Sequence, residues 1–137
     1  MSLVYSTGPL ENASRSGVPG QSTSVTTKVL NNHVYTTITA TIKLFQLDGT
    51  KTLKNTVVLT IPPNSSGHQI FDVSTLLEFE IQIKISPSKD KDDVLIGVFG
   101  KDASGNLNPS HRLVHKELTQ IYNKCIQPCI NKKFRTC

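Results

Sequence analysis

The chain has 137 residues, of which 36% are hydrophobic, and its formal net charge at pH 7 is +5. A chain of this length is expected to form one domain that buries roughly two-thirds of the surface of its unfolded form, so its core requires neither a metal nor a disulfide. The positive charge is concentrated after position 121, where Lys124, Lys132, Lys133 and Arg135 occur without an acidic residue. The first residues do not show the basic and then apolar pattern of a signal peptide, so none is predicted. No apolar run approaches the roughly 18 residues of a membrane span, so no transmembrane segment is predicted either.

Residues 1–20 are rich in Ser, Gly, Pro and Asn and show no sustained hydrophobic period. Such a segment buries too little apolar surface to offset the entropy of ordering it, so we expect an extended N-terminal arm. The arm is interpreted either as a frayed terminus or as a segment that docks on a neighbouring subunit. In the second case Val4, Tyr5 and Leu10 are the expected contacts.

The clearest pattern is a hairpin between residues 34 and 61, in which two alternating runs meet at Asp48-Gly49. Apolar side chains occupy every second position, which is the period of a strand with one buried face. These positions are Ile38, Ala40, Ile42 and Leu44 in the first run and Val57, Leu59 and Ile61 in the second. Asp and Gly tolerate the positive φ of a tight turn, so the pair predicts the turn of the hairpin.

Five more strands are predicted, separated by polar loops. Residues 78–86 alternate most regularly, whereas residues 94–101 are almost continuously apolar and are predicted to be buried on both sides. The seven predicted strands span residues 22–30, 34–47, 51–61, 68–73, 78–86, 93–101 and 111–121.

Strands at this spacing without a helical period predict an all-β fold, a single sandwich of about seven to eight strands with a jelly-roll-like, Greek-key topology. The expected organisation is an extended arm over residues 1–20, the sandwich over 21–121 and a basic, cysteine-rich tail over 122–137. An open sandwich has edge strands, so strand addition between subunits is expected wherever an edge is not blunted.

Two histidines and a glutamate offer the best case for catalysis or metal binding. His111, His115 and Glu117 share one face of the predicted last strand, as an acid–base pair or metal site would require. Surface histidines are the favoured interpretation, because no further ligand, nucleophile motif or phosphate-binding glycine loop accompanies them. We therefore predict no enzyme, no catalytic residue, no metal and no cofactor.

All three cysteines, Cys125, Cys129 and Cys137, lie in the last thirteen residues, where alternation stops. A zinc site would need a fourth ligand from elsewhere. The other interpretations are a bridge between Cys125 and Cys129, disulfides between chains, and free thiols without a role. An odd number of cysteines on a terminal segment, with lysines nearby that favour the thiolate, favours disulfides between chains. Four basic residues without a recognition fold do not predict nucleic-acid binding.

Three stretches, STGPLENASRSGVPGQSTSVTTKVLNN, TATIKLFQLDGTKTL and VLIGVFGKDASGNLNPSHRLVHKELTQI, carry a pattern that extends from about Tyr5 to Ile121. This pattern resembles a group of small β proteins from spore-forming Firmicutes and, more distantly, the endospore appendage subunits of Bacillus-type spores. The resemblance implies a jelly-roll subunit that polymerises into a spore-surface fibre by sheet augmentation, with cysteines of a terminal connector that crosslink successive subunits. In the appendage family the cysteine-bearing connector is N-terminal, whereas here the cysteines are C-terminal.

The resulting hypothesis is a structural, self-assembling subunit of a spore-surface fibre or coat layer, made in the mother cell and locked by disulfides. Its expected partners are copies of itself and, secondarily, other spore-surface proteins. The alternative is a non-catalytic binding module, an adhesin or carbohydrate-binding sandwich that uses the loops at residues 62–67, 86–93 and 102–110.

Overall fold

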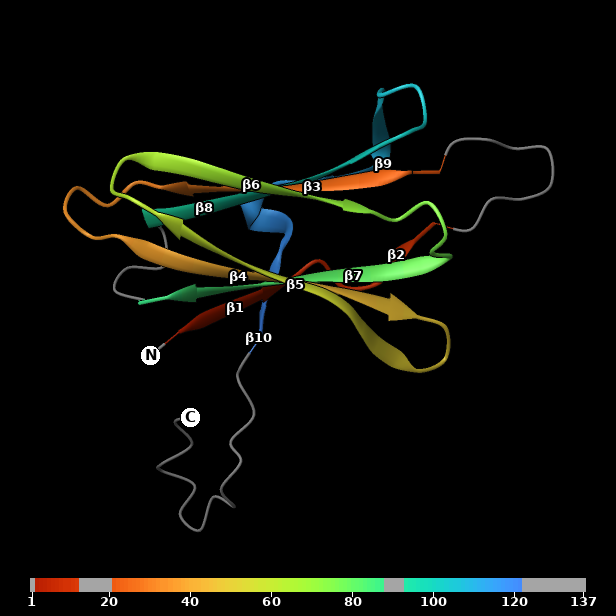
Figure 1. The fold of residues 1–137 in the computed structure, drawn as a ribbon, viewed down its shortest axis with the longest axis horizontal. Coiled ribbons are helices and arrows are strands. Elements are labelled where there is room, and N and C mark those ends of the chain that lie inside the picture. Colours follow the sequence, from red (N-terminus) through yellow and green to blue (C-terminus); the bar gives the residue numbers. More distant parts are fainter. Residues whose placement is uncertain (1, 13–20, 88–92, 122–137) are drawn as a thin grey trace, which may run out of the picture.

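The computed structural model describes residues 2–12, 21–87 and 93–121, and Figure 1 shows them as two layers of β-strands. The described residues contain strands and the short 3-10 helix η2 (His115–Glu117) but no α-helix. The strands are β1 (Leu3–Ser6), β2 (Leu10–Glu11), β3 (Ser24–Asn31), β4 (Ile38–Leu47), β5 (Lys51–Ile61), β6 (Ser65–Asp72), β7 (Glu78–Ser86), β8 (Val94–Lys101), β9 (Leu107–Leu113) and β10 (Thr119–Ile121).

Every pairing between these strands is antiparallel. The first sheet has the order β10-β1-β7-β4-β5, and β2 also pairs with β7. The second sheet has the order β6-β3-β8-β9. The all-β prediction is therefore confirmed, and two antiparallel sheets are compatible with a β-sandwich.

The core lies between the sheets and follows from the alternating pattern. In β4 the predicted apolar positions from Ile38 to Leu44 are all buried, and so are Phe79, Ile81, Ile83 and Ile85 in β7. The buried side chains of β3 and β8 join the same cluster from the second sheet. Each large aliphatic side chain removed from water in this way contributes about 1.5–3 kcal/mol to folding.

In the β4–β5 hairpin the turn and β5 have the predicted boundaries, whereas β4 begins at Ile38 and not at residue 34. Leu47 pairs with Lys51, and Gly49 in the turn has a φ of 88°, a value that few residues other than glycine adopt. The register shifts within the hairpin: Leu44 pairs with Asn55 and the next residue of β4 pairs with Leu53. Lys54 is thus the extra residue of a β-bulge.

The N-terminal segment differs from the predicted arm, because residues 3–11 form β1 and β2 of the first sheet. Val4 and Tyr5 are buried, and Leu10 packs against the core. β1 lies between β7 and β10, so each of its edges pairs with a strand that is distant in the sequence. Such pairing stabilises a segment whose composition alone predicts no structure. The three residues proposed as subunit contacts thus pack against other residues of their own chain.

The last predicted strand, 111–121, is wrong as a single element. β9 begins at Leu107, η2 follows, and only Thr119–Ile121 returns to a strand, in the other sheet. The break is stabilised by Glu117, whose carboxylate accepts a hydrogen bond from the backbone N–H of Val114 at 2.9 Å. A side chain that caps a turn in this way competes with continuation of the strand.

Two smaller differences concern β6 and β8. β6 begins at Ser65, inside the predicted 62–67 loop, because Ser65 pairs with Asn31 of β3. β8 is buried on one face only: Val94, Ile96 and Val98 are in the core, whereas Leu95 is 39% exposed. No further layer of described residues covers the outer face of the second sheet.

Candidate interaction surfaces

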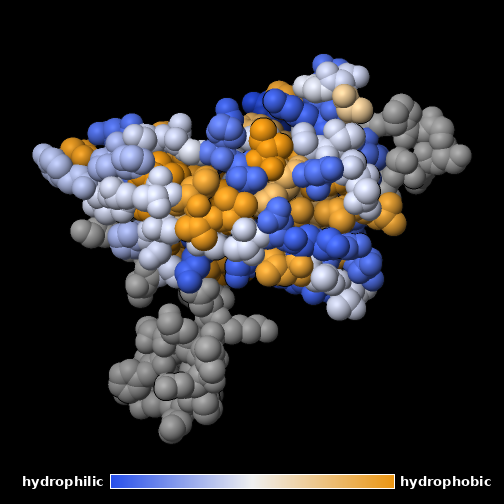
Figure 2. All heavy atoms as spheres, in the orientation of Figure 1, coloured by the Kyte–Doolittle hydropathy of each residue, from blue (hydrophilic) through white to orange (hydrophobic). Residues whose placement is uncertain are grey.

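β5 is a long edge strand of the first sheet. It has eleven residues and pairs with β4 on one side only, so alternate backbone groups on its other side are not used by the sheet. Residues 55–61 read NTVVLTI and contain no charge, proline or glycine. The side chains of Leu53 and Val58 are 50% and 60% exposed. Apolar atoms gather in Figure 2 over the middle of this face, where β5 crosses in front of the other strands in Figure 1.

The first half of β5 carries features that oppose strand addition. Lys54 lies in the bulge, and the ammonium of Lys51 lies 2.9 Å from Oε1 of Glu80 and 4.4 Å from the centroid of the Phe45 ring. Bulges and lysines at a sheet edge keep other chains from pairing with it. The second half, residues 55–61, has no such feature.

Glu80 is a buried carboxylate that ties three strands of the first sheet together. It accepts hydrogen bonds from the Ser6 hydroxyl of β1 and from the Gln82 amide at 3.1 Å, and it pairs with Lys51 of β5. Burial alone would raise the pKa of Glu80, but the hydrogen bonds from Ser6, Lys51 and Gln82 and the charge of Lys51 together hold this pKa below its ordinary value.

A groove with a volume of about 780 Å³ lies on the outer face of the second sheet. Its lining comes from β3, β8, Ser66 of β6, and Val114 with the first two residues of η2, and most of it is apolar. The groove coincides with the outer face of β8, which the sequence predicts to be buried.

The residues of the predicted metal or acid–base site do not meet. His111 is buried in β9, whereas His115 lies in η2, where its Nδ1 accepts a hydrogen bond from the Ile96 N–H at 3.3 Å. Glu117 caps the turn at Val114. No three His, Cys, Asp or Glu side chains within the described ranges are grouped so as to hold a metal ion.

His111 instead forms a buried polar cluster that the sequence does not predict. Its Nδ1 lies 2.7 Å from Oγ of Ser22, its Nε2 lies 2.7 Å from the carbonyl oxygen of Glu11, and the Asn108 amide lies 3.2 Å from the same Oγ. A serine hydroxyl next to an imidazole is the arrangement of an activated nucleophile. Ser22 and His111 are only 1% and 2% exposed, however, and their hydrogen bonds join segments of the two sheets.

Asn12 extends this cluster and joins three segments. Its amide nitrogen donates to the carbonyl oxygens of Ser22, Val73 and Leu76 at 3.0–3.1 Å, and its Oδ1 accepts from the N–H of Ser22. A buried asparagine that satisfies four backbone groups fixes where those segments cross.

Comparisons with known proteins do not identify a relative. No protein-family model matches the chain, and searches among curated proteins and solved structures find no significant match. The described residues include no helix of the length and apolar character needed to cross a membrane.

The three cysteines of the predicted disulfides, Cys125, Cys129 and Cys137, lie outside the described residues. The same is true of most of the predicted 86–93 binding loop.

Proposed function

We propose that this protein is a non-enzymatic structural subunit that assembles with copies of itself by adding strands at the free edge of β5. The observation that carries the proposal is the uncharged sequence of residues 55–61 on an edge strand that pairs with β4 on one side and with no described strand on the other. Strand addition is driven by main-chain hydrogen bonds along such an edge. Segments of six or seven residues with high β-propensity, low charge and no proline pair readily with other chains.

The asymmetry of β5 supports a defined register. Lys51 and Lys54 block the half of the strand next to the hairpin turn, so a second chain pairs with the half that ends at Ile61. Pairing of two identical edges would give a dimer, whereas pairing of β5 with a different edge would give an open fibre.

We further propose a jelly-roll topology for the subunit. The chain changes sheet between β3 and β4, between β5 and β6, between β6 and β7 and between β7 and β8. Repeated crossing between two packed sheets supports this arrangement. The resemblance to spore-surface β proteins supports the same fold, and it is the basis for proposing a spore-surface fibre or coat layer as the location.

Disulfides between chains complete the proposal. Residues 122–137 follow directly after Ile121 of β10, and they contain all the cysteines of the chain. Cysteines confined to a terminal segment link neighbouring subunits without straining the sandwich, and they do so once the assembly leaves a reducing compartment.

The edge is tested by placing charge on it. Val58→Lys together with Thr60→Lys introduces lysines into residues 55–61 of β5, the half without a bulge or lysine. Leu77→Lys is the matched control, because Leu77 is an exposed leucine outside the strands. Sedimentation velocity and electron microscopy should show assemblies for the wild type and the control and a monomer for the double variant. A wild-type protein that stays monomeric at all concentrations contradicts the proposal.

The crosslinks are tested separately, by electrophoresis with and without reductant after oxidation. We expect multimeric bands that disappear with reductant and that are lost when Cys125, Cys129 and Cys137 are all changed to Ser. Assembly that persists in this triple variant would retain the strand-addition proposal and reject the disulfide lock.

A binding module is the second candidate function. The groove on the second sheet favours it, because hollows of this volume are typical of small-molecule sites. The groove lies on a sheet face, away from the 62–67 and 102–110 loops that the sequence suggests for an adhesin or a carbohydrate-binding sandwich.

A further inference from the structure

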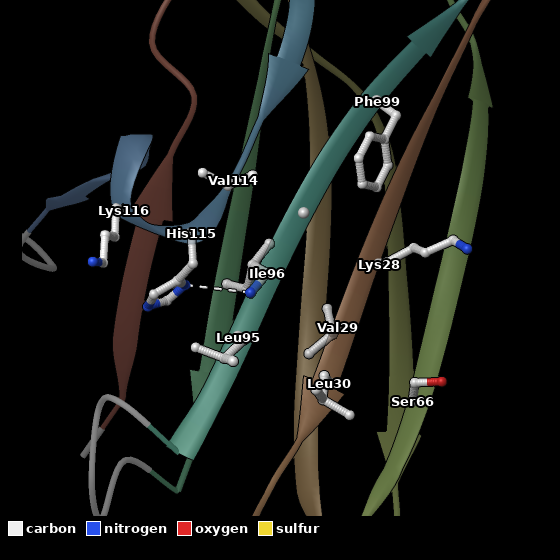
Figure 3. A pocket seen from close by; sticks show the side chains of 11 residues that line it. Lys28, Val29, Leu30, Ser66, Leu95, Ile96, Phe99, Val114, His115 and Lys116 are labelled. Atoms are coloured by element: carbon white, nitrogen blue, oxygen red, sulfur yellow. Dashed lines mark hydrogen bonds between the residues drawn. The ribbon is translucent and has the colours of Figure 1, made fainter. Parts of the chain in front are cut away.

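A glycine lies at the centre of β8, in the lining of the groove on the second sheet. Gly97 has no side chain, and a Cβ atom at this position would lie 3.0 Å from Cζ of Phe99. The Phe99 ring therefore extends over the place where a side chain would stand, and Figure 3 shows this ring at one end of the groove. Glycine in a strand interior often marks a place where another molecule approaches the backbone closely.

Apolar side chains from three separate segments form the surface of the groove. Leu30 of β3, Leu95 of β8 and Val114 before η2 each expose more than a third of their surface, and all three line it. Leu30 and Leu95 are also cross-strand partners. Exposed apolar residues scattered singly need no explanation, but a contiguous and hollowed group is typical of a binding site.

Among the described residues, the Lys and Arg side chains that line the groove, Lys28 and Lys116, are not balanced by any Asp or Glu in its lining. Lys28 and Lys116 lie on opposite sides of it in Figure 3. A smaller hollow of about 210 Å³ shares Lys28 and Phe99 with the groove and adds Lys101. No Asp or Glu lines either hollow among the described residues, and none of these lysines forms an ion pair within that part of the chain.

We propose that this groove binds a free long-chain carboxylate, with its acyl chain on the apolar floor and its carboxylate at Lys28 or Lys116. Apolar walls, together with lysines that have no ion-pair partner among the described residues, match a molecule that has an apolar body and one negative charge. The distance along β8 from Leu95 to Lys101 is about 20 Å at 3.3 Å per residue, which provides length for an extended chain.

A peptide or a sugar fits this surface less well. β3 pairs along its whole length with β6 and β8, β8 pairs with β9 from Val98 to Lys101, and the Ile96 N–H donates to His115, so the sheet face offers no row of main-chain donors to a peptide. Ser66 and Thr26 are the hydroxyl groups along the two hollows. A peptide backbone or a sugar would leave polar groups unpaired against the apolar floor, which costs binding free energy, whereas an acyl chain has none.

The test uses the full chain with reductant present and dodecanoate as the probe, below its micelle concentration, in isothermal titration calorimetry. We expect saturable binding of one dodecanoate per chain, weaker binding of dodecanol and the weakest binding of dodecylammonium. Lys28→Glu and Lys116→Glu together should weaken dodecanoate binding by about tenfold or more. Lys84→Glu is the charge control, because Lys84 is an exposed lysine of β7 in the other sheet.

The apolar floor is tested with Leu95→Asp, and Leu77→Asp is its control because Leu77 is exposed and lies outside the groove. Circular dichroism confirms that each variant folds, and all the substituted side chains are partly or fully exposed. Loss of binding in Leu95→Asp and not in Leu77→Asp is the expected result.

Three results would overturn the inference: no saturable binding of dodecanoate, equal binding of dodecylammonium, or unchanged affinity in the lysine double variant. Binding only to phosphatidylglycerol vesicles, or only to an acidic peptide, would also overturn it in favour of those partners. The proposed site does not involve the β5 edge, so the Val58→Lys and Thr60→Lys variant should bind dodecanoate normally. Failure of either proposal is thereby distinguishable from failure of the other.

Discussion

The hydroxyl oxygen of Ser22 lies 2.7 Å from Nδ1 of His111, although the two residues are 89 positions apart. The other ring nitrogen faces the carbonyl oxygen of Glu11, which only accepts hydrogen bonds. Nε2 therefore carries the proton, and in the neutral ring the hydroxyl of Ser22 donates to Nδ1. Glu11 belongs to the first sheet and His111 to the second, so one imidazole bridges the two layers of the fold.

His111→Ala should lower the free energy of unfolding by about 3 kcal/mol, because it removes the acceptor of the Ser22 hydroxyl and the imidazole donor to the Glu11 carbonyl and opens a cavity. Urea denaturation at neutral pH measures the loss. His68→Ala is the control, since His68 is exposed on β6 and its replacement should have little effect. Equal stability of the two variants would show that the cluster does not hold the sheets together.

Gly100→Ala should be the most disruptive single-methyl change in β8. A Cβ at Gly100 would lie 2.2 Å from Oγ of Ser22 and 2.7 Å from Cβ of His111, so the buried cluster would have to move. We expect a loss of about 3 kcal/mol in urea denaturation. Gly97→Ala is the matched control in the same strand: its new methyl meets only the Phe99 ring, which rotates outward, and the expected cost is about 1 kcal/mol. A smaller loss for Gly100→Ala than for Gly97→Ala would contradict this account.

The alternation of apolar and polar residues correctly predicts the strands that bury one face and expose the other. β4 and β7 have the expected boundaries to within a few residues, because the alternating apolar side chains from Ile38 to Leu44 and from Phe79 to Ile85 face the core. The same argument misjudges β8. Its second apolar face lines an open groove, and periodicity does not distinguish a face that other strands bury from one that stays exposed.

Contacts between distant residues explain what the sequence does not predict. β1 is a strand because β7 and β10 pair with it, and the polar cluster forms because Asn12, Ser22 and His111 meet only after the sheets have packed. Local composition contains no trace of either. The free edge of β5 was expected only in general terms, because strand order decides which strand lies at an edge.

The stability of the protein should fall in acid partly through Glu80. The pKa of this carboxyl is held below its ordinary value in the folded protein, so folding favours the ionised form. Its contribution is fully present above the pKa of the unfolded chain and is lost as the pH falls through the lower, folded pKa. Glu80→Gln should cost about 1–2 kcal/mol at pH 7. The difference between the variant and the wild type should shrink as the pH falls below the ordinary range of glutamate.

Urea denaturation at a series of pH values between 7 and about 3 checks this dependence. Lys51→Met provides a second variant, since it removes one of the groups that lower the pKa of Glu80 and should reduce the acid sensitivity in part. A Glu80→Gln protein that loses stability in acid as steeply as the wild type would show that the carboxylate does not govern this response.

Tyr5→Ala tests whether the N-terminal strand belongs to the fold of its own chain. Tyr5 is 4% exposed, packs in the core and contacts the ring of His115, with 5.0 Å between ring centroids. Removal of a buried aromatic side chain costs about 3–5 kcal/mol. Tyr35→Ala is the matched control, because Tyr35 is 93% exposed in the loop between β3 and β4.

Both variants are measured in urea at a protein concentration where sedimentation shows a monomer. If Tyr5→Ala is as stable as Tyr35→Ala under those conditions, the strand is not part of the monomer and the N-terminal segment is an arm after all. A loss of stability in the monomer would instead show that β1 belongs to the fold of its own chain. The proposed contacts between subunits would then be made by the free edge of β5 and not by the N-terminal segment.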